Sequence, residues 1–208
     1  MVASISNLRL RRLSAGILVG LALASAGAAR ADDPQPAADS STSLYLNALG
    51  PLQFGLAPTL ELGRKTTVLL RLRALNLGLA YQLLAKADDE KVKLGLGGGV
   101  GVHTYFGSTP QHGFYLGGMG ELVYSDTEDD TDDLARYQYV YAVPTFHTGY
   151  RWHAGSFLLG LGLEAGAAVP VSGEAKPIGP DGCAYSDSCG DPSTYAIGML
   201  VFDVGWRL

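Results

Sequence analysis

The chain has 208 residues, of which 15 are Lys or Arg and 20 are Asp or Glu, giving a formal charge of −5. This length fits one domain, and the acidic balance argues against nucleic acid as a partner, because binding to phosphates needs a basic surface. The first 31 residues hold four of the basic residues and none of the acidic ones, so the remainder carries a formal charge of −9.

The N-terminus has the pattern of an export signal. Three arginines within 9–12 precede an apolar stretch, 17–29, that is shorter than the roughly 20 residues of a spanning helix. The small residues around Arg30 match the sequence that signal peptidase cleaves, with 26–28 as a second possible site. We expect residues 1–31 to be a cleaved signal peptide, and an uncleaved membrane anchor is the alternative.

The rest of the chain has the alternation of β-strands. Residues 32–41 are polar, contain two prolines and are predicted to be a disordered lead-in. From residue 42 to residue 208, apolar residues alternate with small or polar ones between turn residues. Eight strands are predicted: 43–49, 53–62, 66–83, 91–106, 113–125, 136–152, 156–171 and 194–208.

Short and long connections follow one another along these strands, except for a short first hairpin at Gly50-Pro51. This alternation is typical of bacterial membrane barrels. The N-terminal third is the least regular part, since segment 66–83 changes phase near 74–76. We interpret the phase change as a bulge or break in a strand, and a helical turn within 69–84 is the alternative.

The second face of the strands distinguishes a membrane barrel from a soluble one. It carries glycines and a balanced set of charges: Glu61, Arg71, Arg73, Lys93, Glu121, Glu164, Asp203 and Arg207. A soluble barrel would place charges in water, whereas glycines and paired charges fit the crowded lumen of an eight-stranded barrel. The leucine and valine face is then left to lipid, where a closed barrel satisfies every backbone group. We therefore expect an all-β, closed antiparallel membrane β-barrel over 42–208.

The C-terminal segment MLVFDVGWRL carries a resemblance to a known family. It resembles the terminal signal of outer-membrane β-barrel proteins, through apolar residues at alternate positions: Leu200, Phe202, Val204, Trp206 and Leu208. The family usually ends in Phe or Trp, and Leu208 departs from that. In length and strand count the chain is similar to the small OmpA-, OmpX- and OmpW-like barrels of Gram-negative cell envelopes. The resemblance implies a place in the cell outer membrane and contact with its lipid and with the barrel-assembly machinery.

Two loops are candidates for binding. Cys183 and Cys189 lie close together in an exported chain, which predicts a disulfide between them. The surrounding segment 172–193 is long enough to bind a surface partner, and a passive loop is the alternative. The acidic loop 126–133 is predicted to be solvated; the alternative is weak cation binding through Asp126, Glu128 and Asp130.

Catalytic motifs are weak. His103 and His147 are expected on the lumen face, and a hydrolytic triad would need His147, Glu164 and Ser156, a set that arises by chance in chains of this size. The run 95–101 lacks the Lys-Ser/Thr of a phosphate loop and is interpreted as a lumen-facing strand. We expect a non-enzymatic outer-membrane barrel without a cofactor, in a structural or surface-binding role. A narrow porin-like channel and, less favoured, a lipid-modifying enzyme are the alternatives.

Overall fold

The computed structural model describes residues 41–87, 90–129, 135–177 and 193–208. The predicted signal peptide 1–31, all but the last residue of the lead-in, and both cysteines lie outside the described residues, as does Asp130. The predicted disulfide and the signal peptide therefore stay predictions.

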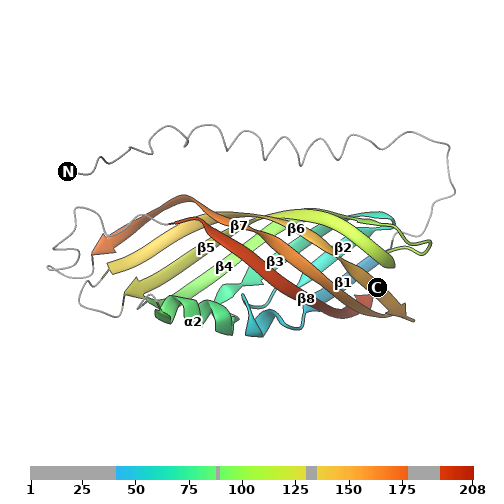
Figure 1. Ribbon diagram of the computed structural model, residues 1–208, viewed down its shortest axis with the longest axis horizontal. Helices are drawn as coiled ribbons and strands as arrows, with labels where there is room; N and C mark the ends of the chain where they lie inside the picture. Colours follow the sequence, from blue (N-terminus) through green and yellow to red (C-terminus); the bar gives the residue numbers. More distant parts are fainter. Residues whose placement is uncertain (1–40, 88–89, 130–134, 178–192) are drawn as a thin grey trace, which may run out of the picture. The chain divides into compact units, whose positions relative to one another are not determined.

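In the described residues, eight antiparallel strands form a closed barrel: each strand pairs with the next, and the last pairs with the first (Figure 1). This confirms the all-β, eight-stranded closed sheet predicted from the alternation. The strands are β1 (Thr42–Asn47), β2 (Thr59–Gly63), β3 (Thr66–Ala74), β4 (Glu90–Tyr105), β5 (Gly113–Asp129), β6 (Ala135–Ala154), β7 (Phe157–Pro177) and β8 (Tyr195–Arg207).

Side chains alternate between the two faces of the sheet, except at two register shifts, in the β4–β5 and β6–β7 pairings. In β3, every second residue from Thr67 to Arg73 is buried inside the barrel, and those between them are exposed outside. The lumen is narrow enough to require glycine at some inward positions. At Gly117, for example, a Cβ atom would lie 2.4 Å from the ring of His103.

The first connection differs from the prediction. The strand expected at 53–62 begins only at Thr59, and residues 48–58 form a loop that contains the 3-10 helix η2 (Gly50–Leu52). The expected short hairpin at Gly50-Pro51 is therefore wrong, and this connection is long like the others at its end of the barrel.

A close approach of two backbones holds this loop in place. Gly55 has a φ of 89°, and a Cβ atom there would lie 1.8 Å from the carbonyl oxygen of Ala74. Only glycine takes this conformation at so short a distance. The next residue, Leu56, then forms an isolated antiparallel bridge with Ala74.

The segment expected as one strand over 66–83 is also shorter. β3 ends at Ala74 and is followed by the 3-10 helix η3 (Leu75–Leu77) and the helix α2 (Leu79–Ala87). The phase change near 74–76 thus marks the end of the strand, and the helical alternative is the correct one. In the described part of the chain, no helix is long and apolar enough to cross a membrane.

The wall of the barrel is uneven in height. β1, β2 and β3 have 5 to 9 residues, whereas β5, β6 and β7 have 17 to 21. We call the end with the short turns and Leu208 the turn end, and the end with η2, η3 and α2 the loop end. The difference in length appears at the loop end, where the wall of β5 to β7 rises beyond β1 to β3 (Figure 1).

The seam between β1 and β8 closes the ring. It contains five paired positions, from Ser43–Arg207 to Asn47–Asp203. The side chain of Asn47 extends the seam, because its amide donates to Leu200 O at 3.2 Å and accepts from Phe202 N at 3.0 Å.

Candidate functional site

Two ionic clusters cross the lumen of the barrel. The lower cluster, nearer the turn end, consists of Arg151, Glu61 and Asp203, all buried. Arg151 on β6 donates to Glu61 on β2 and, at 2.9 Å, to Asp203 on β8. β6 and β2 are four strands apart in the ring, so the contact between Arg151 and Glu61 spans the bore.

Aromatic rings surround the guanidinium of Arg151. Its Cζ atom lies 4.2 Å from the ring centre of Tyr45, 5.4 Å from that of Tyr115 and 5.6 Å from that of Tyr105. These cation–π contacts, and the hydrogen bond that Arg151 donates to the hydroxyl of Tyr105, compensate a charge that has no access to water.

Gln111 closes the lumen below this cluster. It is fully buried, in the turn between β4 and β5, and has a φ of 51°. Its amide donates to the carbonyls of Ser41 at 3.0 Å and Gly63 at 2.9 Å, and accepts from the hydroxyl of Ser43. The turn end is therefore sealed by hydrogen bonds between three segments of the chain.

The upper cluster, nearer the loop end, consists of Arg71, Arg73, Glu121 and Glu164. Arg71 lies 2.8 Å from Glu164, and Arg73 lies 2.9 Å from Glu121 and 3.2 Å from Glu164. The arginines stand on β3 and Glu164 on β7, again four strands away. Two positive and two negative charges balance each other within this cluster.

A histidine pair lies between the clusters. His103 Nε2 and His147 Nδ1 are 3.1 Å apart, and the outer nitrogens lie 3.8 Å from Glu61 and 3.5 Å from Glu164. Ser156, the third member of the possible triad, is exposed in the turn before β7, so the structure does not bring it to His147 and Glu164.

Six of the eight charges expected in the lumen lie in these clusters. Lys93 does not: a register shift between Val92 and Leu94 turns it outward, where it pairs with Glu128 at 2.9 Å. Arg207 faces inward beyond the lower cluster and is half-buried. Sequence reasoning missed Arg151, although its place between the outward aromatics Tyr150 and Trp152 signals a lumen position.

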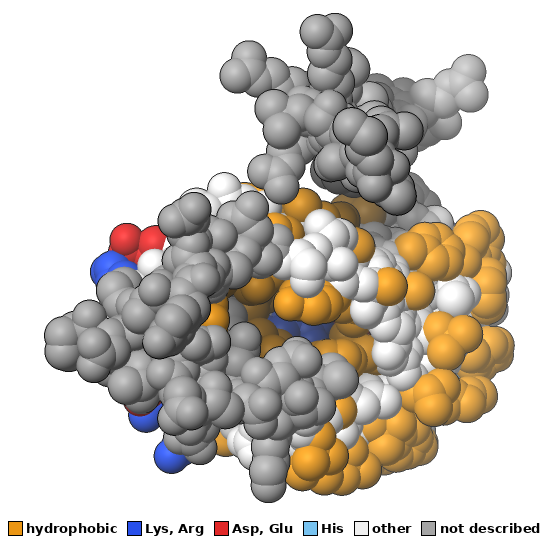
Figure 2. Space-filling model, turned by 60° about the vertical axis from the view of Figure 1, so that its left-hand side comes forward, with side chains coloured by type: hydrophobic (Ala, Val, Ile, Leu, Met, Phe, Trp, Pro, Cys, Tyr) orange, Lys and Arg blue, Asp and Glu red, His pale blue; other side chains and the backbone are white. Residues whose placement is uncertain are grey.

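The loop end opens into a hollow above the upper cluster, which we call the vestibule. Figure 2 shows a hollow with Lys or Arg side chains at its bottom and hydrophobic side chains around it. Its floor is a cavity of about 10 Å³, room for about one water molecule. The floor is lined by Asn47, Gly50, Gly55, Ala57, Arg71, Arg73, Glu164, Met199 and Val201.

The outer surface at the loop end is charged. Asp126, a ligand in the alternative of weak cation binding, accepts hydrogen bonds from Arg136 at 2.8 Å and Gln138 at 3.2 Å. The hydrogen bonds from Arg136 lower the pKa of this carboxyl below its usual value. Glu128 is paired with Lys93, and in the described residues no group of three possible metal ligands occurs.

The alternating residues of the predicted assembly signal share one face, as expected. Leu200, Phe202 and Trp206 on β8 are exposed outside the barrel, and Leu208 follows the strand. Comparison of the chain with protein families, curated proteins and solved structures finds no match.

Proposed function

We propose that this chain is an integral outer-membrane β-barrel with a closed lumen, a non-enzymatic protein whose role is structural or surface-binding. The observation that carries the proposal is the separation of charge between the two faces of one sheet. On the described strands, every outward position between the turn end and the level of Tyr124 and Val140 is uncharged. The ionic side chains over the same height lie inside.

Large apolar side chains cover this outward face. Leu72, Val100 and Leu122 expose 61 to 70% of their surface, and they lie on three neighbouring strands. Soluble monomers rarely expose a continuous apolar patch larger than a few hundred Å². Such a face is stable when it contacts lipid. Because the barrel is closed, no strand edge in the described sheet exposes unpaired backbone groups to the lipid.

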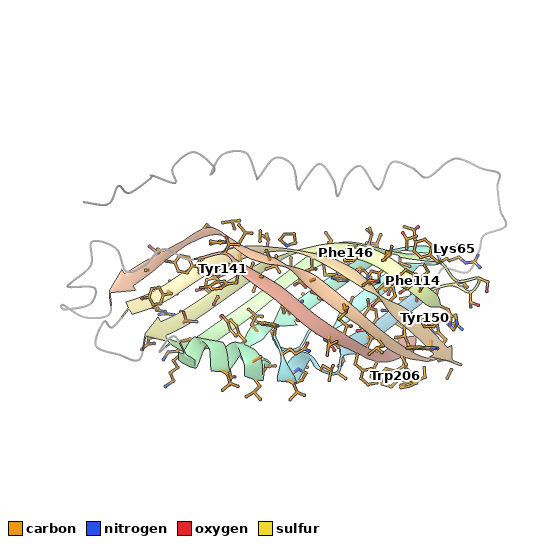
Figure 3. The ribbon with its side chains drawn as sticks, in the orientation of Figure 1. Lys65, Phe114, Tyr141, Phe146, Tyr150 and Trp206 are labelled. Atoms are coloured by element: carbon orange, nitrogen blue, oxygen red, sulfur yellow. The ribbon has the colours of Figure 1, made fainter. Side chains whose placement is uncertain are left out.

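The height of the apolar face fits a bilayer. From Phe114 to Tyr124 along β5, ten steps from residue to residue at a strand tilt of about 40° span about 25 Å, the height of the apolar band in outer-membrane barrels. At the turn end the band finishes in aromatic residues, among them Phe114, Tyr150 and Trp206 (Figure 3). At the loop end it finishes in the charged pair Asp126–Arg136.

The two ionic clusters support a closed barrel rather than a channel. Each cluster joins strands on opposite sides of the ring, and Arg151 of the lower cluster has no exposed surface. A solute would have to break several charge-assisted hydrogen bonds to pass. The loop end is then the part that meets the outside, which suits a surface-binding role.

The two tryptophans of the chain test the membrane proposal directly. Trp152 and Trp206 both face outward near the turn end, with 45% and 57% of their surface exposed. In vesicles, we expect their fluorescence to be quenched by bromine close to the lipid headgroup more than by bromine at the chain terminus. Aqueous acrylamide should quench them weakly. Strong acrylamide quenching without lipid quenching would contradict the proposal.

Conductance distinguishes the closed barrel from the narrow channel. Purified protein in a planar bilayer should give no conductance steps above those of the bare membrane, because both ionic clusters block the lumen. Reproducible small steps would favour the channel. Heat-modifiable migration on a detergent gel should establish, on the same sample, that the barrel is folded.

A further inference from the structure

The tall wall of the vestibule carries a continuous row of aromatic rings. Neighbouring ring centres are 6.3 to 6.5 Å apart along the row Tyr137, Tyr139, Tyr141 and Tyr195. The pairing of β6 with β5 places the β6 part of this row inside, because Tyr139 is opposite Ser125 and Tyr141 is opposite Val123, both of which are buried. Tyr195, at the start of β8, is opposite Ala168 and is 51% exposed. The row therefore runs from the rim of the loop end toward the upper cluster.

The bottom of the vestibule is polar but electrically balanced. Arg73 Nη1 faces the sulfur of Met199 at 4.0 Å, and a thioether is a weak acceptor. The floor cavity beside these two residues has the size of about one water molecule. Because Glu121 and Glu164 already balance the arginines, an added carboxylate would bring an uncompensated charge into a buried site. An uncharged oxygen would offer Arg73 Nη1 a stronger acceptor than the thioether of Met199, without that cost.

We propose that the vestibule binds a small uncharged amphiphile, a mainly aromatic or aliphatic molecule that carries one hydroxyl or carbonyl oxygen. The oxygen accepts a hydrogen bond from Arg73, and the apolar body lies along Tyr141 and Tyr195. This inference rests on the proposed function in one respect, since it names the ligand class for a surface-binding role at the loop end. The lower cluster prevents the ligand from passing through.

Two aromatic probes of the same shape test the charge preference. The binding of 2-naphthol and of 2-naphthoate is measured by equilibrium dialysis at neutral pH against the full chain in lipid nanodiscs, with empty nanodiscs subtracted. We expect 2-naphthol to bind saturably, with one molecule per barrel, and at least about tenfold more tightly than 2-naphthoate. Tighter binding of 2-naphthoate, or no saturable binding, would overturn the proposal.

A matched pair of variants on β6 tests the location. Tyr141→Ala removes an inward ring of the row, and Tyr150→Ala removes an outward ring that is 40% exposed. Tyr141→Ala should weaken 2-naphthol binding by about three- to tenfold, the effect of one aromatic contact, and Tyr150→Ala should leave it unchanged. Equal losses would place the probe at the lipid surface and overturn the site.

A third variant covers the case in which Tyr141→Ala fails to fold. Ile197→Trp fills the vestibule from β8 and should abolish binding without removing any polar group. Repeating the dialysis in detergent separates this inference from the proposed function. Unquenched tryptophans in vesicles would count against the membrane barrel alone, whereas a folded barrel that does not bind 2-naphthol would count against the vestibule alone.

Discussion

The lower and upper ionic clusters use the same chemistry in different surroundings. Both join arginine to carboxylates across the bore, but Arg151 has no exposed surface, whereas Arg71 and Arg73 retain 8% and 6%. The lower cluster is enclosed by tyrosines and by the turn at Gln111. Among the described residues, the upper cluster borders the vestibule because β1 to β3 end lower than β5 to β7 at the loop end. The comparison teaches that strand length decides which ion pairs brace the barrel and which form the floor of a site.

The largest effect is expected where the cluster is most enclosed. Arg151→Met leaves Glu61 and Asp203 buried without their cation and should reduce the free energy of unfolding by about 3–5 kcal/mol. The measurement is urea unfolding in lipid vesicles, followed by the heat-modifiable gel shift.

Lys93→Met is the matched control for this change. Lys93 and Glu128 form an ion pair on the outer surface, with 41% and 36% of their side chains exposed, and an exposed pair contributes about 1 kcal/mol at most. Similar unfolding midpoints for Arg151→Met and the wild type would refute a bracing role for the lower cluster.

A smaller effect is expected at the upper cluster. Glu164→Gln removes one charge from a group in which Arg71 and Arg73 both keep Glu121, and the vestibule can supply water. The free energy of unfolding should fall by about 1.5–3 kcal/mol, the range of a hydrogen bond to a charged group. Glu174→Gln, on the exposed part of β7, is the control and should change it little. A loss as large as that of Arg151→Met would remove the distinction between the clusters.

The smallest effect concerns acid at the loop end, outside the apolar band. The pKa of Asp126 is lowered by the hydrogen bonds from Arg136, so this carboxylate stabilises the β5–β6 hairpin above its usual pKa of about 4. That contribution is lost as the pH falls below about 4, through the lower pKa of the folded protein. Hydrogen exchange of the hairpin, corrected for intrinsic rates, should rise in acid for the wild type. Asp126→Asn should remove the pH dependence, and an unchanged acid response would contradict the assignment.

The sequence predicted most of the fold and part of the site. Alternation identified the long strands β4 to β8, since one face is apolar and the other small or charged. It failed at 53–62 and 75–83, where leucines recur at spacings that fit a strand, and where the close contact of Gly55 with Ala74 depends on the folded structure. A bulge at Lys93 turned this side chain to the outer face, which the alternation of residues in the sequence does not predict.

The pairing of charges lay beyond the sequence for a similar reason. Arg151 and Glu61 are 90 positions apart and meet only because the ring closes with these strands opposite each other. The equal numbers of positive and negative charges indicated that ion pairs form inside the lumen. Which residues pair depends on which strands lie opposite each other in the closed ring.

The seam between the first and last strands is a weak pairing in the barrel. Its five paired positions bring together residues from the two ends of the described chain. Pairing β1 with β8 therefore has the largest entropic cost of loop closure, and it forms few backbone hydrogen bonds in return. The long β5–β6–β7 meander, whose contacts are local, is held far more strongly. We therefore expect the ring to open first between β1 and β8, where the side-chain amide of Asn47 adds two hydrogen bonds across the seam.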